Sequence, residues 1–163
     1  ADFIITTGLI SPHQSAGYSG GRKSIVPGVV SLETLKIHHS LKVRPYEPSV
    51  GFYNVNLFHE VAKESANMVH AGFMLNVIQD PNQQIVGAVA GNLEKAHAAG
   101  VEICRKKNLI DVHGCADLII TSPGGAPRDI DLWQSQKALS VPEMICVPGE
   151  TTFILVAEFH RCL

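Results

Sequence analysis

A short β-branched run followed by a glycine-rich segment constrains this chain more than any other feature. Phe3–Thr7 predicts a strand, and residues 11–28 (SPHQSAGYSGGRKSIVPG) then bring together a histidine, several glycines and an Arg-Lys pair. Glycines let a backbone turn tightly and approach a ligand. Arg22 and Lys23 supply positive charge for a phosphate or carboxylate, and His13 can exchange protons near neutral pH. The segment therefore predicts a site for an anionic cofactor and a proton transfer.

Strand-like and helix-like segments alternate along the whole chain. The β-rich runs predict strands at Phe3–Thr7, Gly72–Ile78, Ile85–Ala90, Asp117–Thr121, Met144–Val147 and Thr152–Val156. The helical patterns predict helices at Ser31–Ser40, Asn56–Val69, Leu93–Lys107 and Asp129–Ser140. The turn residues Asp80-Pro81-Asn82 predict a hairpin between two of the strands. This alternation indicates an α/β fold of layered sheets and helices.

A second pattern that is typical of a site lies in the last third of the chain. A strand ending at Thr121 is interrupted by Gly124-Gly125 and followed by a helix, an arrangement that places ligands at the carboxyl edge of a sheet. On that helix Gln134 and Lys137 lie three residues apart, so they predict a pair that holds a carboxylate by hydrogen bond and charge. A solvated helix face is the alternative interpretation.

Composition excludes several classes of protein and suggests a division of the chain. A formal net charge of -2 gives no basic footprint for nucleic acid, and no apolar run approaches the ~18 residues of a membrane span. The 4 cysteines form no C-x-x-C pair, which favours reduced thiols in a cytoplasm over a zinc site. A new strand, glycine turn and helix begin after Asp111–Gly114, so we expect domains at 1–112 and 113–163.

Most of the remaining histidines are not expected to bind a ligand. Five of them are expected at the surface or at helix ends: His59, His70, His97, His113 and His160. The neighbours His38 and His39 lie on a predicted helix, where adjacent side chains point about 100° apart. We therefore expect only one of this pair to face a site.

Together the two motifs resemble the nickel-dependent lactate racemases, a family of 2-hydroxyacid racemases and epimerases. The first match reads Pro12-His13, Ala16-Gly17-Tyr18-Ser19-Gly20-Gly21-Arg22-Lys23, Val26-Pro27-Gly28 and His38-His39. The second reads Gly124-Gly125-x-Pro127 and Trp133-Gln134-x-x-Lys137-Ala138-Leu139. The family hallmark Ser-Gly-Gly-x-Lys leaves the position of Arg22 unspecified. Two matches in the same order are more specific than one glycine loop.

This resemblance implies a reaction and a set of roles. It implies racemisation of a small 2-hydroxy acid with a nickel pincer nucleotide as cofactor, which takes the substrate's α-hydride while a histidine takes the hydroxyl proton. The implied catalytic residues are His13, Gln134 and Lys137. The implied cofactor-binding residues are Lys23, Ser19, Gly20, Gly21 and Trp133, with Lys23 at a thioamide to which it can be linked covalently. The implied nickel ligand is His39, sixteen residues after Lys23.

Members of the family are longer than this chain, so the resemblance implies the later part of a cofactor-binding domain joined to the start of a second α/β domain. We expect such a piece to be inactive alone and prone to self-association. Trp133 stands where lactate enzymes tend to carry Tyr, which leaves the particular 2-hydroxy acid open. Two alternatives stay open. One is a relative that kept the fold as a binding module, and the other is an unrelated α/β hydrolase whose Gly20–Lys23 loop grips a phosphate.

Overall fold

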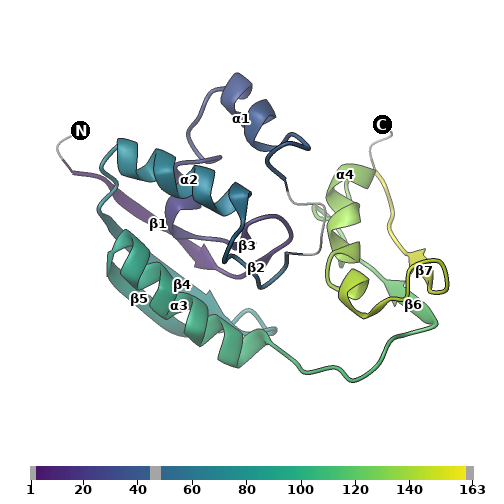
Figure 1. The fold of residues 1–163 in the computed structure, drawn as a ribbon. Coiled ribbons are helices and arrows are strands. Elements are labelled where there is room, and N and C mark those ends of the chain that lie inside the picture. The colour runs from purple at the N-terminus through teal and green to yellow at the C-terminus, as the bar shows by residue number, and fades with distance from the viewer. Residues whose placement is uncertain (1–2, 45–48, 161–163) are drawn as a thin grey trace. The chain divides into compact units, whose positions relative to one another are not determined.

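The chain divides into two compact units, residues 1–110 and 111–163, in a computed structural model that describes residues 3–44 and 49–160 (Figure 1). Strands and helices alternate in both units, which confirms the predicted α/β class. The glycine-rich motif falls in the first unit and the Trp133–Leu139 motif in the second. Within the described ranges, no helix has both the length and the apolar character needed to cross a membrane.

A three-stranded mixed sheet underlies the first unit (Figure 1). Its strands, in spatial order, are β1 (Ile5–Ile10), β4 (Phe73–Gln79) and β5 (Ile85–Asn92). β1 runs parallel to β4, and β4 runs antiparallel to β5. The predicted hairpin between β4 and β5 is confirmed, because the Asp80 carboxylate accepts two backbone N–H groups of the turn at 2.9 Å each. The side chain of Asp80 therefore folds the turn locally.

β1 begins and ends later than the sequence predicted. Gly8 ends the β-branched run, so the local pattern gave a strand over Phe3–Thr7. Parallel pairing with β4 carries the strand through Gly8 to Ile10, with Gly8 opposite Asn76. The partner strand, rather than the intrinsic preference of these residues, thus sets the length of β1.

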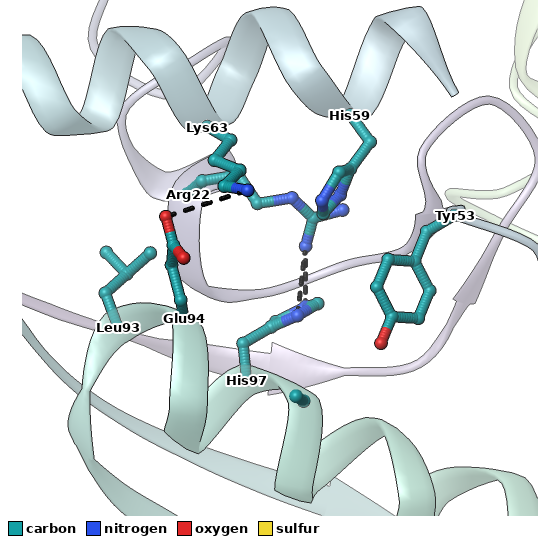
Figure 2. Close-up of a pocket in the computed structure, with 8 residues that line it drawn as sticks. Arg22, Tyr53, His59, Lys63, Leu93, Glu94 and His97 are labelled. Atoms are coloured by element: carbon teal, nitrogen blue, oxygen red, sulfur yellow. Dashed lines mark hydrogen bonds and ion pairs between the residues drawn. The ribbon is translucent and has the colours of Figure 1, made fainter. Parts of the chain in front are cut away.

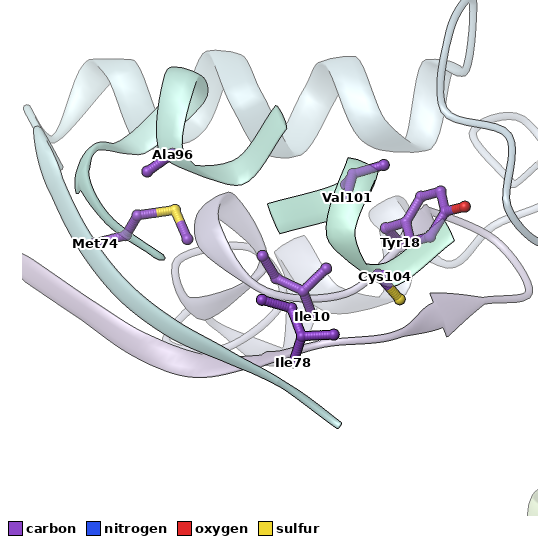
Figure 3. Close-up of a cluster of buried hydrophobic side chains, with 7 residues drawn as sticks. All are labelled: Ile10, Tyr18, Met74, Ile78, Ala96, Val101 and Cys104. Carbon is purple, nitrogen blue, oxygen red and sulfur yellow. The ribbon is translucent and has the colours of Figure 1, made fainter. Parts of the chain in front are cut away.

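Two helices cover this unit. α2 (Leu57–Met68) and α3 (Leu93–Asn108) begin at Asn56 and Asn92, whose side-chain oxygens accept N–H groups of the first turn. α3 packs on the sheet at Gly100, where a Cβ atom would overlap the side chain of Ile10. The buried core beneath it consists of Ile10, Tyr18, Met74, Ile78, Ala96, Val101 and Cys104 (Figure 3).

The glycine-rich motif folds into short elements between β1 and α2. These are β2 (Pro12–His13), β3 (Gly17–Tyr18), the 3-10 turn η1 (Gly21–Ser24) and α1 (Leu32–His38). The first two pair as a small antiparallel ribbon. Ser31 caps the start of α1, because its hydroxyl accepts the N–H of Thr34. The pattern rules had given only a loop before α1, because two-residue strands leave no periodic signal.

The second unit contains a two-stranded parallel sheet and short helical turns. The predicted strands over Asp117–Thr121 and Thr152–Val156 are confirmed as β6 (Leu118–Thr121) and β7 (Thr152–Leu155), which pair with each other. The predicted helix over Asp129–Ser140 is instead α4 (Leu132–Ser135) followed by the 3-10 turn η2 (Gln136–Leu139). The predicted strand over Met144–Val147 is wrong. There the chain forms the 3-10 turn η3 (Pro142–Ile145), with Pro142 at its start, and only Cys146 makes a single bridge to Ala116.

Candidate functional site

The loop after β1 is tied down by its own polar groups. The Ser19 hydroxyl donates to the Leu9 carbonyl at 2.7 Å and accepts the Ser11 N–H at 2.9 Å. The Gly21 N–H donates to the side-chain oxygen of Asn76 on β4 at 3.2 Å. A cofactor contact from Ser19 or Gly21 would therefore compete with hydrogen bonds inside the chain.

The glycines of the motif are required by the packing of the chain itself. Gly17, Gly20 and Gly21 have φ values of 72°, 83° and 54°, a region that side chains other than glycine rarely adopt. A Cβ atom at Gly17 would overlap the backbone carbonyl of Phe52, and one at Gly21 would lie 3.1 Å from the ring of His97. The glycines thus allow other parts of the chain to pack closely against the loop, whereas the sequence had suggested that they allow a ligand to approach it.

Arg22 is the clearest correction to the sequence-based expectation. Its side chain is 1% exposed, so it does not supply charge at the surface of the loop. One terminal nitrogen donates to the carbonyls of Ala16 and Tyr18 at 3.1 and 3.0 Å, and the other lies 3.5 Å from the carbonyl of Gly20. These carbonyl dipoles replace the water that a buried guanidinium loses. The charge of Lys23, by contrast, acts on the neighbouring His38.

His97 from α3 completes the surroundings of Arg22, although the sequence predicted it at the surface or at a helix end. It is 3% exposed, and burial and the charge of Arg22 lower its pKa to about 4. Nη1 of Arg22 lies 2.6 Å from Nε2 of His97, which must accept there because a guanidinium only donates. The same Nε2 lies 2.9 Å from the Ser19 carbonyl. That second contact requires a hydrogen on Nε2, so the two contacts are alternatives.

A cavity of about 190 Å³ lies between α2 and α3 beside this pair (Figure 2). Its charged and aromatic lining comprises Arg22, Tyr53, His59, Lys63, Glu94 and His97. His59 is also buried, contrary to expectation, and burial and the charge of Arg22 lower its pKa to about 3. Lys63 lies 3.9 Å from Glu94 and 4.0 Å from Glu60. Its charge is therefore already balanced by carboxylates.

The ring of His13 is oriented by the loop that follows it. Its Nδ1 accepts the N–H groups of Ser15 and Ala16, both at 3.1 Å. A neutral imidazole that accepts at Nδ1 carries its hydrogen on Nε2, which is then a donor. For Nε2 to accept a proton, the hydrogen must move to Nδ1 and the two amides must turn away. The loop thus determines whether Nε2 of His13 can donate a proton or accept one.

Three histidines gather around the buried ring of Phe58 at the start of α2. The ring centres of His13, His38 and His39 lie 6.4, 3.8 and 5.2 Å from that of Phe58. The expectation that His38 and His39 diverge is wrong, because both contact this ring and their own centres are 5.3 Å apart. His39 follows the last residue of α1, so the angle between helical neighbours does not apply to it.

The two adjacent histidines differ in which nitrogen is engaged. Nε2 of His38 lies 3.0 Å from the Phe58 carbonyl, which fixes its hydrogen on Nε2. Nδ1 of His39 lies 3.2 Å from the Leu35 carbonyl, so its hydrogen lies on Nδ1 and its Nε2 keeps a lone pair. Burial lowers the pKa of His38, and the charges of His39 and Lys23 lower it further. His39 is thus the member of the pair with the electronic state of a metal ligand.

No cluster of three or more His, Cys, Asp or Glu side chains suited to a metal ion occurs in residues 3–44 and 49–160. A metal held by His39 would therefore need ligands from elsewhere. This requirement separates the arrangement from a self-contained protein metal site.

The second unit presents the predicted carboxylate-binding pair. Nζ of Lys137 donates to Oε1 of Gln134 at 2.5 Å, and both residues line a cavity of about 330 Å³ together with Ser122 and Arg128. Arg128 adds a cation that the sequence analysis did not single out; the only signal was its place just after the glycine turn. Trp133 is 56% exposed and is not among the residues that line this cavity.

Comparison with known proteins gives consistent matches. Residues 1–49 match the lactate racemase N-terminal domain. The lactate racemase of Thermoanaerobacterium thermosaccharolyticum is 37% identical over 160 residues, which are 97% of this chain and 37% of that protein. The lactate racemase of Lactiplantibacillus plantarum is 32% identical over 158 residues, which are 96% of this chain and 37% of that protein. The chain belongs to the lactate racemase family.

Solved structures agree with this membership. The apoprotein of the Thermoanaerobacterium thermosaccharolyticum lactate racemase gives a TM-score of 0.87 at 37% identity, covering 97% of this chain and 38% of that one. A protein from Thermotoga maritima gives a TM-score of 0.58 at 18% identity over 78% of this chain, a likeness of fold alone. Family membership rules out the alternative of an unrelated hydrolase. The chain spans about 37% of the length of the curated lactate racemases it matches.

Proposed function

We propose that this chain carries part of the site of a 2-hydroxyacid racemase that uses a nickel pincer nucleotide, with lactate or a close analogue as substrate. The observation that carries the proposal is the gathering of His13 and His39 around Phe58, with Lys23 close enough to act on the adjacent His38. These residues come from separate segments of the family motif. A proton-transferring ring, an amine and a metal-type imidazole therefore lie in one region of the first unit.

The residues present fit such a cofactor. His39 has the Nε2 lone pair that nickel requires, because the Leu35 carbonyl holds its hydrogen on Nδ1. The described part of the chain groups no further metal ligands, and a pincer nucleotide brings its own. Lys23 is the amine proposed to bind its thioacyl carbon. When bound, this cofactor would accept the α-hydride of the substrate and return it.

His13 is proposed to exchange a proton with the substrate oxygen. In the ring state described above, Nε2–H is set to donate to the carbonyl oxygen of a 2-oxo acid. To take a proton from the 2-hydroxy acid, the ring must adopt the other tautomer. That change requires the amides of Ser15 and Ala16, which donate to Nδ1, to turn away from the ring.

Gln134 and Lys137 are proposed to hold the substrate carboxylate. Their direct contact at 2.5 Å presents an amide and an ammonium side by side, and Arg128 lines the same cavity. An incoming carboxylate would accept from Lys137 in place of the Gln134 oxygen and gain charge-assisted hydrogen bonds. Ser19, Gly20, Gly21 and Trp133 stay proposed cofactor contacts. For Ser19 and Gly21, the internal hydrogen bonds of the loop make such contacts weaker candidates than Lys23.

Cofactor loading tests this proposal without relying on turnover. The chain is incubated with nickel pincer nucleotide and freed of unbound cofactor. Nickel content is then measured on the folded chain, and the covalent adduct is measured by mass spectrometry after denaturation. We expect a cofactor adduct in the parent chain and none in Lys23→Arg, which keeps the charge but cannot form the same bond. We expect His39→Gln to keep the adduct and lose most of the nickel.

Equal adduct in Lys23→Arg, or equal nickel in His39→Gln, would contradict the assignments. A chain that binds the nucleotide reversibly, with no adduct and no effect of either variant, would instead support the alternative of a binding module. Lys36→Arg is a suitable control, because Lys36 is an exposed lysine of α1 outside the motif.

A further inference from the structure

Arg22 occupies the unspecified position of the Ser-Gly-Gly-x-Lys hallmark, yet it is the most completely enclosed charged residue in the described part of the chain. It makes no ion pair with a carboxylate within residues 3–44 and 49–160. Its hydrogen bonds go to the carbonyls of the loop that carries His13. A side chain that only filled space would not need a charge there, and burying that charge is costly.

The contacts of Arg22 reach His13 through a single residue. The carbonyl of Ala16 accepts from Nη2 of Arg22 at 3.1 Å, and the N–H of the same Ala16 donates to Nδ1 of His13 at 3.1 Å. On its other side Arg22 rests against His97 of α3, at 2.6 Å. The sequence separation between Arg22 and His97 is 75 residues. Arg22 therefore connects the loop to α3, whose His97 is buried in the first unit.

We infer that Arg22 is a positioning residue: seated against His97, its guanidinium fixes the peptide at Ala16 and thereby holds the His13 ring with its hydrogen on Nε2. The planar fork is essential, because one nitrogen spans two carbonyls while the other faces His97. Lysine at this position would bring the same charge with a single nitrogen. The roles of His13 and Lys23 in catalysis rest on the proposed function, whereas the hold of Arg22 on the ring does not.

The test is the tautomer of His13 in the 163-residue chain without cofactor or substrate. Nitrogen-15 NMR distinguishes a ring protonated on Nε2 from one protonated on Nδ1. In the parent chain we expect an acceptor-type Nδ1 and a donor-type Nε2. In Arg22→Ala we expect the two shifts to move toward each other, as the tautomers mix. Hydrogen exchange at the amides of Ser15 and Ala16 should accelerate by about tenfold to a hundredfold, the worth of hydrogen bonds to a charged group.

Chemical rescue separates positioning from general loosening. The cavity of about 190 Å³ beside Arg22 gives free guanidinium a route to the space that the Arg22→Ala variant leaves. Guanidinium, at concentrations too low to unfold the chain, should restore the His13 shifts, and sodium or ammonium should not. Lys63→Met is the matched control, because Lys63 lines the same cavity and, among the residues that the structure describes, forms its ion pairs with Glu60 and Glu94. Its His13 shifts should equal those of the parent.

Three results would overturn the inference. These are unchanged His13 shifts in folded Arg22→Ala, a change that guanidinium and ammonium reverse equally, and the same change in Lys63→Met. Should Arg22→Ala fail to fold, Arg22→Lys takes its place and must show the same shift, since a single ammonium nitrogen cannot both bridge the carbonyls of Ala16 and Tyr18 and contact His97. The outcome is independent of cofactor loading. A His13 shift in a chain that never forms the Lys23 adduct would refute the proposed function alone.

Discussion

Mild acid should unfold the first unit, because this unit buries two histidines, His59 and His97, in their neutral state. Burial, with the charge of Arg22 second, lowers the pKa of His97 from 6.5 to about 4 and that of His59 to about 3. The unfolded chain therefore binds more protons than the folded one in this window. Stability is full above pH 6.5 and falls as the pH drops toward 4.

The size of the effect follows from the shifts. Each pH unit between the unfolded and folded pKa values costs about 1.4 kcal/mol per group. Between pH 6.5 and 4 each histidine would thus cost on the order of 3 kcal/mol. Protonated His59 would recover part of this from Glu60, which lies 3.8 Å away and is half exposed. A domain of this size is stable by only about 5–15 kcal/mol, so the loss is large.

Urea unfolding at a series of pH values measures the prediction, with far-UV circular dichroism and hydrogen exchange of α3 amides as probes of the first unit. Trp133 is the only tryptophan in the sequence, so its fluorescence reports the second unit separately. His59→Leu should remove roughly half of the pH dependence, because it removes one of the two buried neutral histidines. The substitution should be tolerated, since Nδ1 of His59 has no hydrogen-bond partner to lose. His70→Asn, at an exposed position, should leave it unchanged. An equal pH dependence in parent and His59→Leu would refute the reasoning.

Two further variants test single features. Gly17→Ala should destabilise the first unit by about 2 kcal/mol or more in urea unfolding, because φ is 72° and the new Cβ would overlap the Phe52 carbonyl. Gly91→Ala, with φ of 137° and no atom within 4 Å, should cost less, and equal costs would contradict the overlap argument. Lys137→Met should weaken lactate binding about tenfold, followed by NMR at the Gln134 side-chain amide. Exposed Lys107→Met is its control, and an unchanged lactate titration in Lys137→Met would exclude the carboxylate role.

Local patterns predicted most of the secondary structure. α2 and α3 were found within about one residue of their ends, because each has a polar N-cap and a helical repeat that are readable from neighbours alone. Errors occurred where a distant partner decides the outcome. Pairing with β4 extended β1 past Gly8, and Pro142 began a 3-10 turn inside a segment that looked like a strand.

The sequence proposed members of the candidate site but gave no access to its geometry. The motif spacing selected His13, Lys23 and His39, and the structure brings the two histidines to one buried ring. Nothing in the sequence indicated Phe58 as that ring or His38 as a third histidine beside it. A contact between α1 and α2 places them, and no local rule reports such contacts.

The sequence by itself determined the α/β class, the two motifs and the family, because all three are written in residue types and short spacings. Tertiary structure alone decided which charged groups face water. Arg22 was expected to supply charge for a phosphate or carboxylate, and His97 to lie at the surface or at a helix end, yet they are buried in contact with each other across 75 residues of sequence. The physical reason is that burial depends on which surfaces meet when α3 packs over the loop. The same meeting sets the pKa of His97 and the orientation of the loop that carries His13.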